Sequence, residues 1–367
     1  MFGSFYSNKR VFLTGHTGFK GSWLAEWLLL LGAEVHGYAL DPQPHEVLYG
    51  QLGLEQRLAS DTRGDLADRT KLDQALADAK PDVILHLAAQ PLVRLSYDIP
   101  VETFATNVMG TAHVLDAVRR LDRPCTVICI TTDKCYENRE WLHAYRENDA
   151  MGGHDPYSAS KGAAELVISS FRDSFFSRQA GGHGIKLASA RAGNVIGGGD
   201  WAIDRIVPDC IRAIRAGQPI AVRNKIATRP WQHVLEPLGG YLWLAARLAN
   251  QSDLASSFNF GPALTSNRTV ADLVCQLLNH LPGEWIDASD PNAPHEASKL
   301  NLAIDKAFHL LGWQPVWDFP TTIAMTAAWY QGEAEGASPG ELTCSHIQTY
   351  QEAATKLKLP WTGTAPL

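Results

Sequence analysis

A tyrosine and a lysine that can carry out proton chemistry stand four residues apart, at Tyr157 and Lys161. Asp155 and Pro156 come just before them, and proline suits the first turn of a helix. On a helix, a spacing of four places two side chains on one face. A nearby ammonium stabilises a phenolate, so we expect Lys161 to lower the pKa of Tyr157 from its ordinary value of about 10. The pair would then supply a base near neutral pH. Without further motifs, however, a tyrosine and a lysine at this spacing are more typical of a solvated helix face.

A second polar group directly follows an apolar run at 126–131, which predicts a buried strand. The group consists of Thr132, Asp133 and Lys134. In parallel α/β proteins, ligands bind at the carboxyl ends of the strands. At that place Thr132 could hydrogen-bond a substrate hydroxyl, while Asp133 and Lys134 would add an acid and an amine. The alternative is a polar turn without a chemical role.

Three glycines, Gly15, Gly18 and Gly21, lie between a predicted strand at 11–14 and a helical pattern at 23–31. A glycine-rich turn between a strand and a helix lets the backbone approach a pyrophosphate closely. The positive end of the helix dipole then faces the phosphates. The spacing differs from the usual GxGxxG fingerprint, but its context predicts a dinucleotide site.

Acidic residues after the next strands could contact the adenosine part of such a dinucleotide. Asp41 closes a predicted strand at 34–40, where a carboxylate can accept hydrogen bonds from a ribose. It would repel a 2′-phosphate, so it favours NAD over NADP; the alternative is a turn-forming aspartate before Pro42. Asp65 and Leu66 follow a third strand region and could contact the adenine.

The positioning elements alternate between strand-like and helix-like segments. Such alternation, with nearly continuous apolar strands, predicts a parallel sheet covered by helices on both faces. The expected strands are 11–14, 34–40, 82–89, 126–131, 186–191 and, late in the chain, 257–261. The expected helices include one after Pro100, one from Pro156 through Phe171, and two near 206–216 and 238–249.

Composition excludes several other classes of protein. The chain has 367 residues, of which 45% are hydrophobic and 19% charged, with a net charge of -7. This acidity argues against an electrostatic nucleic-acid binder. The six cysteines form no Cys-x-x-Cys pair, so we expect no zinc or other metal site. No apolar run is long enough for a signal peptide or a membrane span, so we expect a cytoplasmic protein.

Taken together and in this order, the motifs resemble the extended short-chain dehydrogenase/reductase family over roughly residues 8–320. They are Gly15-x-x-Gly18-x-x-Gly21, Asp65-Leu66, Leu87-Ala88-Ala89-Gln90, Asn107, Thr132-Asp133-Lys134, Tyr157-x-x-x-Lys161 and Arg191-x-x-Asn194-Val195. The resemblance implies a Rossmann-type doubly wound sheet with NAD as cofactor. It also implies a NAD-binding domain at 1–190 with a returning segment near 226–262, and a smaller substrate-binding domain at 191–225 and 263–367.

Within that family, the chain looks like the nucleotide-sugar 4,6-dehydratases, which are hydro-lyases of deoxysugar and lipopolysaccharide biosynthesis. The Asp133-Lys134 pair departs from the Asp-Glu pair of the branches that use dTDP- and GDP-sugars. Together with the segments 14–23, 197–201 and 229–234, it is similar to the branch that uses CDP-glucose.

The resemblance also implies a reaction. Tyr157 takes the proton of the sugar 4-hydroxyl while hydride passes from C4 to NAD. The new ketone acidifies the C5 proton, which Lys134 removes, and Asp133 protonates the departing 6-hydroxyl. Hydride then returns to C6 and a proton to C5. A lysine needs a much lowered pKa to act as a base, so the alternative for Lys134 is an ion pair with a phosphate or carboxylate.

The binding residues that the resemblance implies form two sets. The expected cofactor contacts are Gly15, Gly18, Phe19, Gly21, Asp41, Asp65, Leu66, Ala88, Gln90, Asn107, Tyr157 and Lys161. The expected substrate contacts are Asn194, Trp201, Arg205, Arg229, His233 and Lys299. Arg229 suits a diphosphate because its planar fork can bind two oxygens at once. Trp201 is equally well explained as a core residue, and Arg205 and Lys299 as surface charges.

Two other functions stay open at this point. An epimerase or decarboxylase of the same family would use the same cofactor and the Tyr157-Lys161 pair, but it would need no acid at Asp133. A non-catalytic NAD-sensing or scaffold protein is the second alternative. Helices near Pro100–Arg120 and Ser158–Asp173 match those that pair across the family's dimer interface, so we expect a homodimer, with a tetramer left open.

Overall fold

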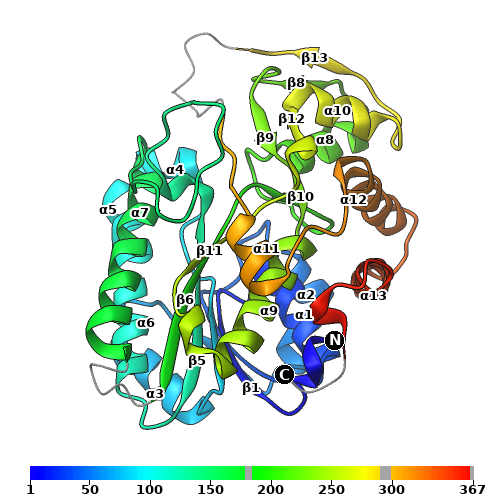
Figure 1. Cartoon of the computed structure of the whole chain (residues 1–367). Helices are drawn as coiled ribbons and strands as arrows, with labels where there is room; N and C mark the ends of the chain where they lie inside the picture. The colour runs from blue at the N-terminus through cyan, green and yellow to red at the C-terminus, as the bar shows by residue number, and fades with distance from the viewer. Residues whose placement is uncertain (178–183, 290–298, 364–367) are drawn as a thin grey trace.

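A seven-stranded parallel sheet forms the centre of the protein, in the order β11-β6-β5-β4-β1-β2-β3 (Figure 1). The structure is a computed structural model that describes residues 1–177, 184–289 and 299–363. The strands are β1 (Arg10–Thr14), β2 (Glu34–Ala39), β3 (Ser60–Arg63), β4 (Val83–His86), β5 (Cys125–Thr132), β6 (Ile185–Ala192) and β11 (Ser257–Phe260). The predicted doubly wound α/β class is confirmed.

Helices cover both faces of this sheet, because its strands are apolar on both sides. Along β1, Val11 and Leu13 belong to one hydrophobic core and Phe12 to the other. The helices beside Phe12 are α3 (Arg69–Ala79), α6 (Gly110–Arg119) and α7 (Pro156–Phe171). Those beside Val11 are α1 (Phe19–Leu30), α9 (Leu235–Asn250) and α13 (Pro339–Lys356). Figure 1 shows the two layers on opposite sides of the sheet.

Two elements differ from the sequence prediction near the glycine turn. Strand β4 ends at His86 rather than at 89, because the amides of Leu87 and Ala88 both donate to the Thr14 hydroxyl at 3.1 Å and turn the chain into a loop. Helix α1 is buried on nearly all sides from Gly21 to Leu28, not along one face, because α13 and α9 pack against it.

The helix predicted after Pro100 is interrupted. It consists of α5 (Pro100–Phe104), a π-helical turn, η3 (Ala105–Met109), and α6. Turns of this kind are frequent at functional sites. Here the turn carries Asn107, whose side chain is buried.

Short strand pairs and further helices lie beyond the carboxyl ends of the central sheet (Figure 1). The pairs are β7 (Val195–Ile196) with β10 (Gln232–His233), β8 (Ile220–Val222) with β13 (Trp285–Asp287), and β9 (Thr228–Pro230) with β12 (Asn267–Thr269). The helices are α8 (Ile206–Arg215), α10 (Val270–Leu278) and α12 (Phe319–Ala334), with α2 (Leu48–Gln51) and α4 (Val93–Asp98) nearer the sheet. Helix α11 (Asp305–Leu311) packs against β11 and α9. Helix α9 and strand β11 return to the sheet; the domain boundaries themselves stay a prediction.

In the part of the chain that the structure describes, every helix is too short or too polar to cross a lipid bilayer.

Candidate active site

Helix α7 carries the predicted Tyr157-Lys161 pair and begins with a firm cap. The Asp155 carboxylate accepts a hydrogen bond from the Ser158 amide at 2.9 Å, and Pro156 occupies the first turn. The amide of Tyr157, which the first turn leaves without a helical partner, donates to the Ser96 hydroxyl of α4 at 3.1 Å. These contacts fix the start of α7 and so the place of the phenol.

The end of β5 meets the catalytic face of α7. The Lys161 ammonium donates to the main-chain oxygen of Ile130 at 3.2 Å, and a hydrogen bond links Tyr157 with the Thr132 hydroxyl. Both Tyr157 and Lys161 are more than nine-tenths buried. The structure therefore brings together two of the motifs that the sequence separates by more than twenty residues.

The electrostatics of Tyr157 correct one expectation. Burial raises the pKa of Tyr157 to about 12, although the hydrogen bond with Thr132 and the charge of Arg205 act to lower it. Lys161 does not reverse this effect; burial lowers its own pKa to about 8. The physical reason is that both charged forms lose hydration in the same buried place. The phenol is therefore protonated at neutral pH in this state of the protein.

Asp133 is fully buried directly after β5, in the short helix η4 (Asp133–Cys135). One carboxylate oxygen accepts from the Thr132 hydroxyl at 2.9 Å and lies 3.9 Å from the Lys134 ammonium. The other oxygen is buried, faces Gly193, and has no hydrogen-bond partner among the described residues. Because an unpaired buried oxygen is costly, this atom is suited to a partner on a bound ligand.

Sequence reasoning missed Lys20, which joins the same cluster from α1. Its ammonium lies 5.9 Å from the centre of the Tyr241 ring. Burial lowers the pKa of Lys20 to about 7; Arg205 acts in the same direction and Asp133 opposes it. The available signal was a lysine at the start of a helix whose next eight residues are all buried.

The glycine turn fits a diphosphate. A β-carbon on Gly15 would lie 2.7 Å from the Ala88 amide nitrogen, and Gly15 has a φ of +74°, which disfavours other residues. A β-carbon on Gly21 would lie 2.0 Å from the Gly15 oxygen. Gly18 is the N-cap of α1, with no side chain capping the helix, and Phe19 begins it. The first turn of α1 thus keeps amides that an anion can bind, beside the Glu46 carboxylate, which lies next to Gly18.

Two other predicted cofactor residues join the loop after β4 to α7. The amide of Gln90 donates to the Asn107 side-chain oxygen at 2.8 Å. The Asn107 amide group donates in turn to the Ser160 hydroxyl at 2.9 Å. The π-helical turn directs Asn107 into this position, so Asn107 helps to fix the loop; contact of Ala88, Gln90 and Asn107 with a cofactor stays a prediction.

The predicted adenosine contacts lie beyond the carboxyl ends of β2 and β3, the last two strands on one side of the sheet. Asp41 follows β2, and its side chain is 85% exposed, with the Arg63 guanidinium 3.7 Å away. The main-chain oxygen of Asp65 accepts from the Tyr38 hydroxyl at 2.8 Å, and Leu66 is buried. An exposed carboxylate at the end of β2 has the placement that a ribose contact needs.

Three predicted substrate residues lie near the Tyr157 cluster or present buried polar atoms. The Arg205 guanidinium binds Asp200 at 3.1 Å and is close enough to influence Tyr157. The side-chain oxygen of Asn194 is buried without a partner among the described residues. Arg229 is buried on β9 and donates to the Thr228 main-chain oxygen at 2.9 Å.

The other three are placed differently. Trp201 packs against the edge of Tyr330, with the ring centres 5.2 Å apart. His233 is completely buried against Trp23 and Trp317, and burial lowers its pKa far below the ordinary value. Lys299 is exposed, and its main-chain oxygen accepts a hydrogen bond from the Asn138 side chain at 3.1 Å. The enclosure of His233 argues against the predicted substrate contact.

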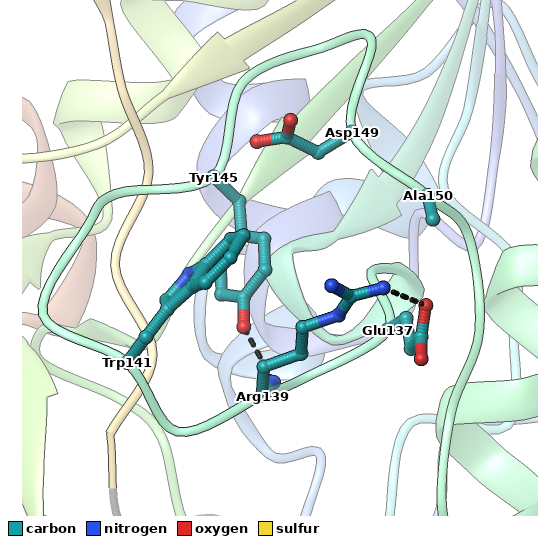
Figure 2. Close-up of a pocket in the computed structure, with 6 residues that line it drawn as sticks. All are labelled: Glu137, Arg139, Trp141, Tyr145, Asp149 and Ala150. Atoms are coloured by element: carbon teal, nitrogen blue, oxygen red, sulfur yellow. Dashed lines mark hydrogen bonds and ion pairs between the residues drawn. The ribbon is translucent and has the colours of Figure 1, made fainter.

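A surface pocket of about 130 Å³ lies on the loop that follows η4, outside this cluster (Figure 2). Its lining residues are Glu137, Arg139, Trp141, Tyr145, Asp149 and Ala150. Arg139 pairs with Glu137 at 3.1 Å, and its amide donates to the Tyr145 hydroxyl at 2.7 Å. The charges of this pair compensate each other, and none of the predicted site residues lines the pocket.

Comparison with known proteins places these features in a family. Residues 12–326 match the GDP-mannose 4,6 dehydratase family. A CDP-glucose 4,6-dehydratase of Salmonella typhimurium is 47% identical over 360 residues, which cover 96% of this chain and 99% of that enzyme.

Solved structures show the same fold at lower identity. A dTDP-glucose 4,6-dehydratase of Streptomyces venezuelae, with NAD and TYD bound, has a TM-score of 0.76 and 22% identity, covering 90% of this chain and 99% of that one. A UDP-glucose 4-epimerase of Thermotoga maritima, with UDP-glucose, has a TM-score of 0.74 and 18% identity, covering 88% and 99%. The fold is thus shared by dehydratases and epimerases, and only the site can separate the two.

Proposed function

The chain belongs to the GDP-mannose 4,6-dehydratase family of nucleotide-sugar-modifying enzymes, and from that premise we propose that it converts CDP-glucose to CDP-4-keto-6-deoxyglucose with NAD. One observation carries the proposal. Asp133 presents a buried carboxylate oxygen that has no hydrogen-bond partner among the described residues, beside the hydroxyl of Thr132, which in turn meets Tyr157. An epimerase has no water to eliminate and no use for such an acid. The 47% identity to a CDP-glucose enzyme supports this choice of substrate.

The described residues fit NAD as the cofactor. Gly15 and Gly21 leave no room for a side chain, and the N-terminus of α1 at Gly18 is uncapped. Asp41 would accept hydrogen bonds from the adenosine ribose. Bound at this place, the cofactor would supply hydride-transfer chemistry between C4 and C6 of the sugar. The protein's part is to move the protons.

Tyr157 would remove the proton of the 4-hydroxyl, with Thr132 holding that hydroxyl by a hydrogen bond. Since burial raises the pKa of Tyr157 to about 12, the phenolate needs positive charge nearby. Arg205 already acts to lower this pKa, and Lys161 is held one helical turn away. Tyr157 would then act as a base only when these positive charges and the bound ligands are in place around it.

Asp133 and Lys134 would perform the elimination. Transfer of a proton from the Lys134 ammonium to the Asp133 carboxylate, which lie 3.9 Å apart, would give an amine and a carboxylic acid. The 4-ketone makes the C5 proton acidic; the Lys134 amine would take this proton, and the C5–H electron pair would form the C5–C6 double bond. The C6–O bond breaks as Asp133 donates its proton, so that water leaves. Once C6 has been reduced, the Lys134 ammonium would return a proton to C5. The 3.9 Å ion pair with Asp133 is the alternative role of Lys134.

We also propose a homodimer. Helix α5, turn η3 and helix α7 expose apolar side chains, among them Val101 at 74%, Met109 at 53% and Leu166 at 63%. A second copy of the chain would cover them, as apolar patches of this kind usually mark an interface. Cytoplasmic location and a place in lipopolysaccharide synthesis stay predictions.

The test is an assay with NAD and four nucleotide sugars: CDP-glucose, dTDP-glucose, GDP-mannose and UDP-glucose. Mass spectrometry should show loss of one water from CDP-glucose, with one solvent deuterium incorporated at C5 when the reaction runs in heavy water. An unchanged mass with inverted stereochemistry at C4 would show an epimerase instead. Absence of water loss with all four substrates would refute dehydration.

A further inference from the structure

A buried ion pair lies next to the catalytic residues and takes no part in the reaction described above. The Glu165 carboxylate and the Arg191 guanidinium are 2.8 Å apart, with side chains 4% and 5% exposed. Glu165 also accepts hydrogen bonds from the hydroxyls of Thr131 and Ser189, the latter at 2.8 Å. Burying two charges is costly, and the Nε of Arg191 has no hydrogen-bond partner among the described residues. A buried pair of this kind calls for an explanation beyond stability.

Glu165 extends the catalytic face of α7. It lies four residues after Lys161, which itself lies four after Tyr157. Each of the three side chains binds a different residue at the end of β5. Lys161 binds Ile130, Glu165 binds Thr131, and Tyr157 meets Thr132. The helix and the strand are therefore held in one register by three consecutive contacts.

Arg191 ties the opposite side of the site to the same carboxylate. From β6, its guanidinium donates to the Tyr136 hydroxyl at 2.7 Å and to the Glu147 main-chain oxygen at 3.0 Å. It also lies 5.0 Å from the centre of the Tyr136 ring. Tyr136 is the residue that follows η4, the turn of Asp133 and Lys134. The ion pair thus connects the helix of the base with the turn of the acid.

The charge of Lys161 depends on its surroundings. Ionisable groups reach the site from several elements: Tyr157 and Glu165 on α7, Cys129 on β5, Asp133, Lys134 and Cys135 on η4, His86 on β4, Lys20 on α1, Arg191 on β6, Tyr241 on α9, and Arg205 just before α8.

Three of these groups act to raise the pKa of Lys161: first Glu165, then Cys129 and Cys135. Burial raises the pKa of both thiols above the ordinary value, so neither is charged at neutral pH. Burial also raises the pKa of Glu165, but Arg191 and the hydroxyl donors outweigh this effect, and the net pKa is below the ordinary value. Glu165 is therefore the anion that favours the ammonium.

We propose that Glu165 and Arg191 are positioning residues for the reaction: Glu165 keeps Lys161 protonated on the Ile130 carbonyl, and Arg191 holds the Asp133-Lys134 turn in register with α7. This inference rests on the proposed function, because it assigns a role within that reaction. It differs from a purely structural role in one respect. A structural pair affects stability alone, whereas this pair also sets the pH range in which Lys161 is charged.

The test is the pH profile of kcat/KM for Glu165→Gln, which keeps the shape of the side chain and removes its charge. The Lys161 pKa is already about 8, so loss of the neighbouring anion moves the alkaline limb toward neutral pH. We expect a shift of about one pH unit, which is roughly a tenfold loss of kcat/KM on the alkaline side. Arg191→Met, which leaves Glu165 unpaired and favours its protonation, should shift the limb in the same direction, and Arg191→Lys should restore part of it.

Glu236→Gln is the matched control. Glu236 is a second fully buried glutamate, on α9, and it accepts hydrogen bonds from the amides of Val316 and Trp317 at 2.9 and 2.7 Å. Its removal should lower the melting temperature without moving the alkaline limb. If Glu165→Gln does not fold, Ser189→Ala removes one hydrogen bond from the carboxylate and should give a smaller shift in the same direction.

The outcomes separate the two proposals. Wild-type protein that dehydrates none of the nucleotide sugars refutes the proposed function. The positioning role alone is overturned if the wild-type protein is active and either of two results is found. In the first, Glu165→Gln has the same alkaline limb as the wild type. In the second, Glu236→Gln shifts the limb as much as Glu165→Gln does.

Discussion

The ammonium of Lys161 lies 3.2 Å from the main-chain oxygen of Ile130, two residues before the threonine that meets Tyr157. This contact is to the strand, not to the phenol. Any action of Lys161 on Tyr157 in the assembled site must therefore come through its charge, from a fixed place, and the register between β5 and α7 decides how close that charge lies. The catalytic predictions below follow from this arrangement.

Tyr157→Phe should abolish turnover while leaving the fold intact. The variant loses the hydroxyl but keeps the ring, and the Tyr157 main-chain contact to Ser96 is unaffected. General base catalysis typically contributes 10²- to 10⁴-fold, so we expect kcat to fall by about 10³. Far-ultraviolet circular dichroism and NAD titration provide the control. A Phe variant with kcat within threefold of wild type would show that another group takes the 4-hydroxyl proton.

Asp133→Asn should separate oxidation from elimination. The carboxylate is fully buried, and its free oxygen has no described partner, so the amide should occupy the same space but cannot supply the acid proton. We expect dehydration to slow by about 10²-fold, with oxidation at C4 retained. Trapping the 4-keto sugar with borodeuteride measures this, because deuterium at C4 on a sugar that keeps its 6-hydroxyl identifies the oxidised, undehydrated species. If the yield of the trapped 4-keto sugar falls as much as dehydration does, Asp133 is not specifically the acid of the elimination step.

Lys134→Met tests which role Lys134 has. Its ammonium is 3.9 Å from Asp133, and the side chain is 17% exposed, so Met can fill the space without charge. If Lys134 takes the C5 proton, deuterium incorporation at C5 should fall at least tenfold along with dehydration. If it only pairs with Asp133 or a phosphate, KM rises and deuterium incorporation per turnover is unchanged. Full dehydration with normal deuterium incorporation at C5 would rule out Lys134 as the base.

Periodicity and composition predict the sheet well and the site only in part. The apolar runs that became β1, β5 and β6 are visible in the sequence because a buried parallel strand needs a continuous apolar run. The glycine turn and the Tyr157-Lys161 spacing are equally local. Each of these features depends on residues close together in the chain.

What was missed depends on distant segments. The burial that raises the pKa of Tyr157 comes from several elements at once, as does the burial of α1, which α13 covers from more than three hundred residues away. Lys20 lies in a motif that sequence reasoning assigned to phosphate binding, yet the charges that act on it are those of Arg205 and Asp133. Charge environments of this kind need the tertiary structure.

Lys20→Met should stabilise the protein without cofactor, and the gain should depend on pH. Burial lowers the pKa of Lys20 from 10.5 to about 7, so the folded state binds this proton less tightly than the unfolded state. The cost to stability is full below pH 7 and disappears as the pH rises toward 10.5. We expect the variant to gain on the order of 2 kcal/mol at pH 7 and almost nothing at pH 10, measured by urea unfolding. A gain that is equal at both pH values would mean that Lys20 is not the responsible charge.

Asp41→Ala should widen the choice of cofactor toward NADP. The Asp41 carboxylate is exposed at the end of β2 and would repel a 2′-phosphate, while the Arg63 guanidinium lies 3.7 Å away and would attract one. Removing the carboxylate takes away the repulsion and leaves Arg63, which also pairs with Asp61 at 2.9 Å, as the charge nearest the phosphate. We therefore expect the Kd for NADP to fall at least tenfold, while the Kd for NAD rises about tenfold with the lost ribose contact. Titration of both cofactors followed by calorimetry measures the two constants. The double variant with Arg63→Ala is the matched control and should lose the gain for NADP while keeping the weaker NAD binding. If Asp41→Ala leaves both constants unchanged, the ribose does not lie at the end of β2, and the adenosine must be held by other residues.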